Sequence, residues 1–218
     1  MKGLAQAKFI TFEGGEGAGK STQIKRLSAY LDDKGVDHIQ TREPGGSYGS
    51  EEIRKLLVEG ETNRWDPETE ALLHFAARRD HLVKTVQPAL SGCKWVLCDR
   101  FADSTTAYQG YGHGVSKDGL EQLYTLVSSG RRPDLTFILD VDVEAGLLRA
   151  RSRSDKADIA REDRYERMGV AFHERLRAGF LEIAEKEPDR CVLIDAGKDA
   201  DAVFDDVRTV VNQRFLEV

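Results

Sequence analysis

The sequence predicts an α/β protein with three layers, in which a five-stranded parallel sheet is flanked by helices. Short apolar segments of strand length alternate along the chain with longer amphipathic segments. Four of the five strand candidates are largely apolar, as expected of strands that are covered on both faces. The alternation of strand and helix candidates implies parallel strands joined by right-handed crossovers.

Five segments are strand candidates, and seven are helix candidates. The strand candidates are residues 8–12 (KFITF), 37–41 (DHIQT), 94–98 (KWVLC), 135–139 (LTFIL) and 191–195 (CVLID). The helix candidates are residues 20–34, 50–59, 67–90, 117–129, 143–153, 163–187 and 200–215. DHIQT is the one strand candidate that is not largely apolar.

The helix candidate at residues 67–90 has a clear start. Asp66 can cap the helix, and Pro67 suits the first helical position because its missing N–H would have no partner there. Glu68 and Glu70 follow in the first turn, where the positive end of the helix dipole stabilises carboxylates. These residues predict that the helix begins at position 67.

The length of 218 residues suits one domain that spans residues 1–218. No internal repeat, low-complexity tract or linker rich in Pro, Gly or Ser divides the chain. Residues 151–164 (RSRSDKADIAREDR) contain almost no apolar side chain and interrupt two helix candidates. We therefore predict a small, exposed and mobile lid at residues 150–164 within the domain.

The composition argues against several classes of protein. A formal net charge of −6 disfavours bulk nucleic-acid binding, although a local cluster of cations can still hold a small phosphorylated ligand. The chain has no run of about 18 apolar residues that predicts a membrane span, and its start lacks the features of a secretory signal. Cys93, Cys98 and Cys191 are unevenly spaced, which argues against a zinc site or a disulfide framework. We expect reduced thiols in a cytoplasmic protein.

The segment Gly14-x-x-x-x-Gly19-Lys20-Ser21 matches the P-loop pattern and lies between a strand candidate and a helix candidate. Glycines let backbone N–H groups turn around phosphate oxygens, and the helix N-terminus adds a partial positive charge. Lys20 would reach the β- and γ-phosphates, and Ser21 would offer its hydroxyl to Mg²⁺. The residues expected at the triphosphate are Gly14, Gly15, Glu16, Gly17, Ala18, Gly19, Lys20, Ser21 and Thr22. The motif predicts a nucleoside triphosphate site, and GTPases, motor ATPases and small-molecule kinases all share it.

Asp99 and Arg100 follow the apolar strand candidate KWVLC. Charged residues at the carboxyl end of a parallel strand lie where such sheets bind ligands. Asp99 could hold Mg²⁺ directly or through water, and the planar guanidinium of Arg100 could bridge donor and acceptor phosphates. The alternative is a structural salt bridge between the two side chains.

Five segments together resemble the bacterial thymidylate kinases, from about residue 8 to about residue 200. They are FITFEGGEGAGKST (9–22), TREPGGS (41–47), HFAARRDHL (74–82), DRFADSTTAYQG (99–110) and FHERLRAGF (172–180). The resemblance implies the P-loop fold of nucleoside monophosphate kinases and transfer of the γ-phosphoryl group of ATP to dTMP, giving dTDP for dTTP synthesis. It also implies Mg²⁺ as cofactor and a homodimer.

The resemblance places an acceptor site in three of these segments. Arg78 matches the arginine that grips the monophosphate, and Arg42 and Pro44 lie in the turn that lines the acceptor site. The positions that match residues around the thymine and sugar are Ser104, Thr105, Tyr108 and Gln109, and their spacing allows one helix face. Tyr108 is the expected steric guard against a ribose 2′-hydroxyl.

One position departs from the family pattern. Members commonly have Phe four residues before the acceptor arginine, where it stacks on thymine, but this chain has His74 there and Phe75 next to it. A neutral imidazole can stack with less apolar area, or Phe75 can replace it, although one helix position corresponds to about 100° of rotation. Both residues are therefore candidates.

Glu16 matches an acidic P-loop position that faces the acceptor side in this family. Its carboxylate could accept a hydrogen bond from the 3′-hydroxyl of the sugar and steady Arg42 or Arg100. No cation precedes Lys20 in the loop, so the lid is expected to supply one, as in the bacterial subclass with lid arginines. The arginines in and beside the lid are Arg149, Arg151, Arg153, Arg161 and Arg164. Arg153 is the expected catalytic finger, and Arg149 is expected at the adenine.

Two other functions are compatible with parts of the sequence. The chain could be a kinase for another nucleoside monophosphate, which an assay across the monophosphates would distinguish. It could also be a nucleotide-binding switch or an inactive regulator, which would need only one nucleotide site. Arg78, Arg100 and Gln109 argue against the switch because they belong to a second site.

Overall fold

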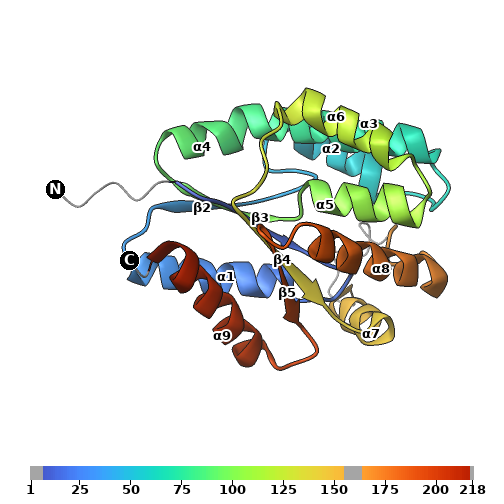
Figure 1. Cartoon of the computed structure of the whole chain (residues 1–218). Helices are drawn as coiled ribbons and strands as arrows, with labels where there is room; N and C mark the ends of the chain where they lie inside the picture. Colours follow the sequence, from blue (N-terminus) through green and yellow to red (C-terminus); the bar gives the residue numbers. More distant parts are fainter. Residues whose placement is uncertain (1–6, 155–163, 217–218) are drawn as a thin grey trace.

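The structure, a computed structural model, describes residues 7–154 and 164–216, and its centre is a five-stranded sheet (Figure 1). The strands are β1 (Phe9–Glu13), β2 (His38–Arg42), β3 (Trp95–Asp99), β4 (Leu135–Asp140) and β5 (Cys191–Asp195). Their order is β2-β3-β1-β4-β5, and every neighbouring pair is parallel. This confirms the predicted fold class, and each predicted strand agrees with the observed one to within one residue at either end.

Helices cover both faces of the sheet (Figure 1). On one face, α1 (Lys20–Asp33) and α9 (Ala200–Val211) form a core with β1 and β4, in which Leu27 and Val207 are fully buried. On the other face, α3 (Pro67–His81) and α6 (Lys117–Ser128) pack over β3. Beside them, α8 (Val170–Lys186) packs on β4 and β5.

The remaining helical segments connect the elements of this frame. They are α2 (Tyr48–Val58), α4 (Gln87–Ser91), α5 (Ala102–Thr105), α7 (Val143–Ser154) and the π-helical turns η1 (Leu82–Val86), η2 (Thr106–Gly112) and η4 (Asn212–Leu216). None of the helices in the described ranges is long and apolar enough to cross a membrane.

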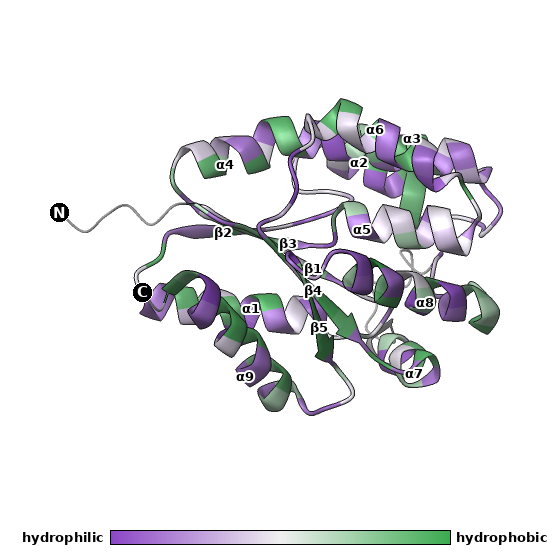
Figure 2. Cartoon of the chain, viewed as in Figure 1, coloured by the Kyte–Doolittle hydropathy of each residue, from purple (hydrophilic) through white to green (hydrophobic). Residues whose placement is uncertain are grey.

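The position of β2 in the sheet explains why DHIQT is polar although it forms a strand. The central strands are predominantly green in Figure 2, whereas β2 is largely purple. Strand β2 lies at the edge of the sheet and pairs only with β3, and its residues are partly or fully exposed. An edge strand buries less surface, so it tolerates polar side chains.

The helix predicted at 67–90 is confirmed as a continuous helical segment from Pro67 to Ser91, in which the π-helical turn η1 joins α3 to α4. Its start is as expected, because Asp66 accepts a hydrogen bond from the Thr69 N–H at 3.0 Å. The helix predicted at 163–187 begins only at Val170, after a turn that ends at Gly169. No helix was predicted over residues 102–112, yet α5 and η2 lie there, because tertiary contacts with α8 stabilise a segment of modest helix propensity.

Candidate active site

The P-loop connects β1, the central strand, with α1. Gly17 has φ +68°, and a Cβ there would lie 1.9 Å from the carbonyl oxygen of Gly146. Gly14 has φ +128°, and a Cβ there would lie 2.3 Å from the carbonyl oxygen of Leu139. Both positions require glycine because the loop turns sharply against the neighbouring backbone. The helix that follows begins at Lys20, so its N-terminal N–H groups face the loop.

Lys20 lies within the P-loop and is only 7% exposed. Its Nζ donates hydrogen bonds to the carbonyl oxygens of Gly14 at 3.2 Å and Gly15 at 2.9 Å. Burial, followed by the charge of Arg100, lowers the pKa of Lys20 to about 8, although nearby carboxylates act in the opposite direction. The ammonium group is therefore held where phosphate oxygens would offset the cost of its burial.

Ser21 and Asp99 meet across the first turn of α1. The Ser21 hydroxyl donates a hydrogen bond to Asp99 Oδ2 at 2.6 Å. Asp99 ends β3, the strand next to β1, which explains how residues 78 positions apart come together. A hydroxyl and a carboxylate are hard oxygen ligands of the kind that Mg²⁺ prefers. The described residues contain no group of three or more His, Cys, Asp or Glu that could hold a metal by itself.

Arg100 connects the P-loop with the segment after β3. Its φ of +67° is rare for a residue other than glycine, and its N–H donates to the carbonyl oxygen of Phe12. The guanidinium donates to the carbonyl oxygen of Gly14 at 2.9 Å, to Ser104 Oγ at 3.2 Å and to Glu16 Oε1 at 3.0 Å. Arg100 forms an ion pair with Glu16, whereas the sequence had also allowed a structural salt bridge with Asp99.

Glu16 is the carboxylate within the P-loop. It accepts hydrogen bonds from Arg100 and, at 2.6 Å, from the hydroxyl of Tyr108. Burial alone would raise the pKa of Glu16, but Arg100, Lys20 and the Tyr108 hydroxyl lower it to about 2. Glu16 therefore stays ionised and is turned toward Tyr108 and Arg100, two residues of the expected acceptor site.

A second cavity adjoins the P-loop and contains most of the predicted acceptor residues. Its lining is Glu16, Glu43, Pro44, Arg54, Val58, His74, Arg78, Arg100, Phe101, Ser104, Thr105, Tyr108, Gln109, Tyr165 and Glu166. Two residues of this lining, Arg78 and Gln109, each have a buried polar atom, Nη1 and Oε1, without a hydrogen-bond partner among the described residues. One is a donor and the other an acceptor, so each lacks a partner that a ligand could supply.

The guanidinium of Arg78 is 2% exposed and partly engaged. Its Nε donates to Glu43 at 2.8 Å, and its Nη2 donates to the carbonyl oxygen of Phe101 and to Thr105 Oγ1. Only Nη1 is left for a ligand, so Arg78 cannot grip a phosphate through two parallel hydrogen bonds without breaking these contacts. Glu43, which the sequence analysis did not select, already neutralises part of its charge.

His74 and Phe75 occupy different environments. His74 lines the cavity, and its Nε2 lies 3.0 Å from the hydroxyl of Tyr165. Burial and the charge of Arg78 lower the pKa of His74 to about 3, so the imidazole is neutral at pH 7. Phe75 does not line the cavity: it is 3% exposed and packs in the apolar core beneath Arg78. The expectation that Phe75 contacts the acceptor is therefore wrong, because Phe75 is part of the core.

Arg42 lies outside the cavity of His74. Its guanidinium donates to Glu51 at 3.1 Å and lines the adjoining space beside the P-loop, together with Lys20 and Asp99. The cavity also has lining residues that were not predicted from the sequence: Glu43, Arg54, Val58, Phe101, Tyr165 and Glu166. Glu43 lies in TREPGGS and Phe101 in DRFADSTTAYQG, so two of the motifs already contained a signal for them. The other four residues come to the cavity only through tertiary folding.

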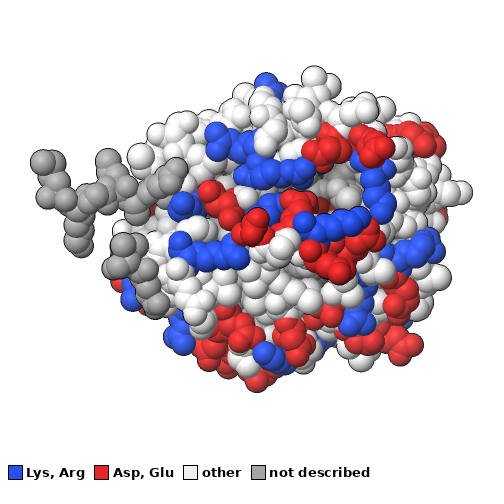
Figure 3. Space-filling view, in the orientation of Figure 1, with Lys and Arg blue, Asp and Glu red and all other residues white. Residues whose placement is uncertain are grey.

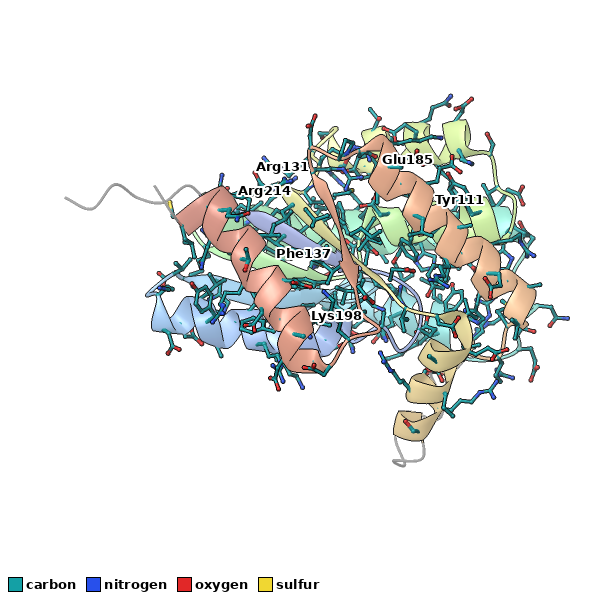
Figure 4. All side chains as sticks on the ribbon, turned by 60° about the horizontal axis from the view of Figure 1, so that its bottom comes forward. Tyr111, Arg131, Phe137, Glu185, Lys198 and Arg214 are labelled. Carbon is teal, nitrogen blue, oxygen red and sulfur yellow. The ribbon has the colours of Figure 1, made fainter. Side chains whose placement is uncertain are left out.

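A third hollow lies at the opposite end of the P-loop. It is lined by Gly17, Ala18, Gly19, Thr22, Gln23, Arg149, Ala196, Lys198, Asp199, Ala200 and Val203. Arg149 donates to the carbonyl oxygen of Ala196 at 2.9 Å. Figure 4 shows Lys198 in the loop between β5 and α9. Arg149 thus lies on the side of the loop away from the acceptor cavity, where the base of a bound triphosphate would be expected.

The lid arginines whose side chains the structure describes, Arg149, Arg151 and Arg164, lie in different environments. The side chain of Arg153 and the whole of Arg161 lie outside the described residues, and Arg151 is exposed at the end of α7. Arg164 is fully buried: it pairs with Glu70 and donates to the carbonyl oxygens of Leu57, Glu61 and Thr62. The prediction that Arg164 belongs to an exposed segment is wrong, because a buried carboxylate and three carbonyl groups bind its guanidinium.

The face of the molecule drawn in Figure 3 carries charges of both signs. On the face drawn in Figure 3, Lys and Arg side chains alternate with Asp and Glu side chains. This face therefore presents no continuous basic surface of the kind that follows a nucleic-acid backbone.

The fold and the loop define a P-loop nucleotide-binding protein in which a second ligand cavity adjoins the phosphate loop. The family model for thymidylate kinase matches residues 12–207. The chain belongs to the thymidylate kinase family.

Relatives cover nearly the whole chain. The thymidylate kinase of Caulobacter vibrioides is 54% identical over 211 residues, which are 97% of this chain and 99% of that protein. The thymidylate kinase of Dinoroseobacter shibae is 50% identical over 200 residues, which are 92% of this chain and 94% of that protein. The crystal structure of thymidylate kinase from Ehrlichia chaffeensis superposes with a TM-score of 0.76 at 38% identity and covers 94% of this chain and 98% of that one.

Proposed function

We propose that the protein transfers the γ-phosphoryl group of ATP to dTMP, giving ADP and dTDP for dTTP synthesis. The observation that carries the proposal is the second cavity beside the P-loop, two of whose lining residues have a buried unpaired polar atom, the donor Arg78 Nη1 and the acceptor Gln109 Oε1. Thymine offers the complementary pair, a carbonyl oxygen and the adjacent N3–H. The family relationship supports the same reaction and offers no support for a kinase of another nucleoside monophosphate.

In this proposal, ATP binds along the P-loop. Backbone N–H groups of residues 14–22 hold its phosphates, Lys20 contacts the β- and γ-phosphates, and Arg149 lies beside the adenine. Ser21 and Asp99 would hold Mg²⁺ together with phosphate oxygens and water, since the Ser21 hydroxyl and the Asp99 carboxylate are both oxygen ligands and lie 2.6 Å apart. Bound there, the ion would neutralise charge on the phosphates.

The acceptor occupies the cavity lined by His74. The neutral imidazole of His74 stacks on the thymine ring, Arg78 Nη1 donates to a carbonyl oxygen of the base, and Gln109 Oε1 accepts from N3–H. This assignment moves Arg78 from the phosphate to the base, because its Nε and Nη2 are engaged by protein groups. Tyr108 remains our proposed guard against a 2′-hydroxyl.

Arg100 is the proposed phosphate ligand of the acceptor. It lies between the P-loop and Ser104, at the junction of the two cavities, so its guanidinium can contact both phosphates. Glu16 holds Arg100 in place and can accept from the sugar hydroxyl, and Arg42 lines the same junction. Lys20, Arg100 and a lid arginine, for which we propose Arg153, would spread the charge of the transferring phosphoryl group.

We also propose that the protein is a homodimer. The exposed apolar side chains of Tyr48, Leu72 and Leu126 lie on α2, α3 and α6, three helices that pack in one layer. Burying such side chains against a second copy would remove apolar surface from water. Sedimentation equilibrium should give about twice the chain mass, and a monomer at micromolar concentration would contradict this proposal.

The decisive experiment measures ADP release by the purified protein with ATP and Mg²⁺ and each nucleoside monophosphate in turn. We expect the highest kcat/KM with dTMP, and a lower value with dUMP because it lacks the methyl group. A clear preference for a purine monophosphate or for dCMP would overturn the acceptor assignment. No turnover with any monophosphate, despite nucleotide binding, would favour a regulatory protein instead.

A further inference from the structure

Glu70 is a buried carboxylate behind the wall of the acceptor cavity, and it does not line that cavity itself. It lies in the first turn of α3 and is 1% exposed. Its Oε1 accepts a hydrogen bond from Gln109 Nε2 at 2.8 Å, and its Oε2 lies 2.5 Å from Arg164 Nη1. Glu70 therefore connects a cavity-lining amide with the buried arginine that follows the lid.

The chemistry of these partners determines which way the Gln109 amide points. An ionised carboxylate only accepts hydrogen bonds, so the amide must turn its nitrogen toward Glu70. The amide oxygen then remains on the other side, where it is buried and without a partner among the described residues. Gln109 belongs to the lining of the acceptor cavity, so a ligand in that cavity would supply the partner that this oxygen lacks.

We propose that Glu70 is a specificity-determining positioning residue: by fixing the amide of Gln109, it makes the cavity select a pyrimidine that carries an N3–H. This inference rests on the proposed function and adds the residue that determines the choice of base. Thymine and uracil donate from N3, whereas cytosine has an acceptor there. With the oxygen of Gln109 turned inward, cytosine would leave two acceptors facing each other, which costs the hydrogen bonds of both.

Arg164 fixes the position of the Glu70 carboxylate on the side away from the cavity. Its guanidinium is fully buried and donates to three main-chain carbonyl groups, one at the end of α2 and two in the segment that follows it, as well as to Glu70. A guanidinium only donates hydrogen bonds, so it keeps an acceptor directed toward itself at position 70. The orientation of Gln109 is thus determined by a chain of two residues, Arg164 and Glu70, of which neither lines the cavity.

This chain predicts what Glu70→Gln would do. Arg164 would bind the oxygen of the new amide, which would turn its NH₂ group toward Gln109. Gln109 would then have to present its own oxygen to position 70 and its nitrogen to the cavity. The cavity would show two donors where it now shows a donor and an acceptor, so recognition of N3–H would be lost while N3 of cytosine would gain a partner.

The test measures kcat/KM for dTMP and for dCMP with the full-length wild-type protein and with Glu70→Gln. We expect the ratio of the dTMP value to the dCMP value to fall at least about tenfold in the variant, because a hydrogen-bonded site discriminates strongly. The KM for ATP should stay unchanged, since Glu70 lies on the acceptor side. A folded variant whose ratio stays within twofold of the wild-type ratio would overturn the inference.

A matched control separates base selection from general damage. Asp103 forms a comparably buried ion pair with Arg190, with two contacts of 2.7 Å, and neither residue lines the acceptor cavity. Asp103→Asn should lower the melting temperature without changing the ratio for the two substrates. An equal change of the ratio in this control would mean that any loss of buried charge relaxes the site, and would overturn the role of Glu70.

If Glu70→Gln does not fold, the double variant Glu70→Met with Arg164→Met replaces the buried pair by apolar side chains of similar length. The Gln109 amide would then have no anchor, and the same ratio should fall. An unchanged ratio in the folded double variant would again overturn the inference. Failure of the wild-type protein to use dTMP would instead overturn the proposed function, which keeps the two conclusions distinguishable.

Discussion

Arg100 shows how a single residue is prepared for its position before any ligand arrives. The main chain adopts a left-handed conformation that is unfavourable for a side chain with a Cβ. Strand β1 holds that turn, because the carbonyl oxygen of Phe12 accepts the Arg100 N–H and the Glu13 carboxylate accepts the Phe101 N–H. Burial, with Asp103 nearby, raises the pKa of Glu13 to about 7. The guanidinium is thereby aimed at the junction of the two cavities.

The pKa of Lys20 predicts a pH dependence of ATP use. The free enzyme should lose the Lys20 proton above about pH 8, and with it the charge that attracts the β- and γ-phosphates. We therefore expect kcat/KM for ATP to fall roughly tenfold per pH unit above that value. A profile between pH 6 and 10 tests this, and a flat profile up to pH 10 would show that Lys20 stays protonated. Lys20→Arg is the control, because its guanidinium keeps its charge across this range.

The proposed catalytic role of Arg153 makes a second prediction at the same scale. Arg153→Ala should lower kcat by about 10³-fold while the KM for dTMP changes little, since a finger arginine stabilises mainly the transition state. Steady-state kinetics with both substrates measure the two effects. Arg151→Ala is the matched control, because Arg151 is two residues away on the exposed end of α7. If Arg151→Ala lowered kcat more than Arg153→Ala, Arg151 would be the catalytic arginine instead.

At the scale of elements, the P-loop depends on how closely two backbone segments approach. The loop between β1 and α1 packs against α7 so tightly that Gly17 leaves no room for a side chain beside Gly146. The strands position the other site elements in the same way: the register of β1 with β3 pairs Phe12 with Asp99, so the P-loop and the Asp99–Arg100 pair come together. The site is therefore built at the carboxyl ends of two adjacent strands.

Gly17→Ala should disrupt the loop and weaken ATP binding at least about tenfold. The new methyl group would lie 1.9 Å from the Gly146 carbonyl oxygen, and the φ of +68° disfavours any side chain. Isothermal titration with ATP measures the change. Gly15→Ala is the control, because a Cβ there meets nothing within 4 Å. If Gly17→Ala and Gly15→Ala both bound ATP as the wild type does, the close packing against Gly146 would not explain why residue 17 is glycine.

At the scale of the whole molecule, three hollows form one path across the carboxyl edge of the sheet. The acceptor cavity and the space beside the P-loop share Glu16, Glu43 and Arg100, and that space shares Gly17 and Gly19 with the hollow near Arg149. Two ligands can therefore lie end to end with their phosphates toward the centre. This arrangement suits in-line transfer between bound nucleotides.

Separate cavities predict independent stabilisation by two ligands that together cannot react. ADP and dTMP should each raise the melting temperature, and both together should raise it by about the sum. A ligand at 100 times its Kd contributes about 2.7 kcal/mol, which corresponds to roughly 5–10 °C for a chain of this size. Differential scanning fluorimetry measures the three shifts. If dTMP abolished the shift caused by ADP, the two nucleotides would compete for one site.

The sequence by itself determined the features that depend on local patterns. Each of these patterns lies within about ten consecutive residues: an apolar strand, the helix cap at Asp66, and the glycine spacing of the P-loop. The five strands and the phosphate site could therefore be predicted. The candidate acceptor positions depend on a resemblance to a family and not on a local pattern with its own geometry.

Only the tertiary structure decided which charges and rings face the ligands. Arg164 looks like an exposed lid cation in the sequence, yet it is buried against Glu70, 94 positions earlier in the chain. His74 and Phe75 are neighbours, but the packing of α3 on the sheet sends Phe75 into the core and leaves His74 on the cavity. Burial and ion pairing depend on partners that are distant in the sequence, and no local pattern records them.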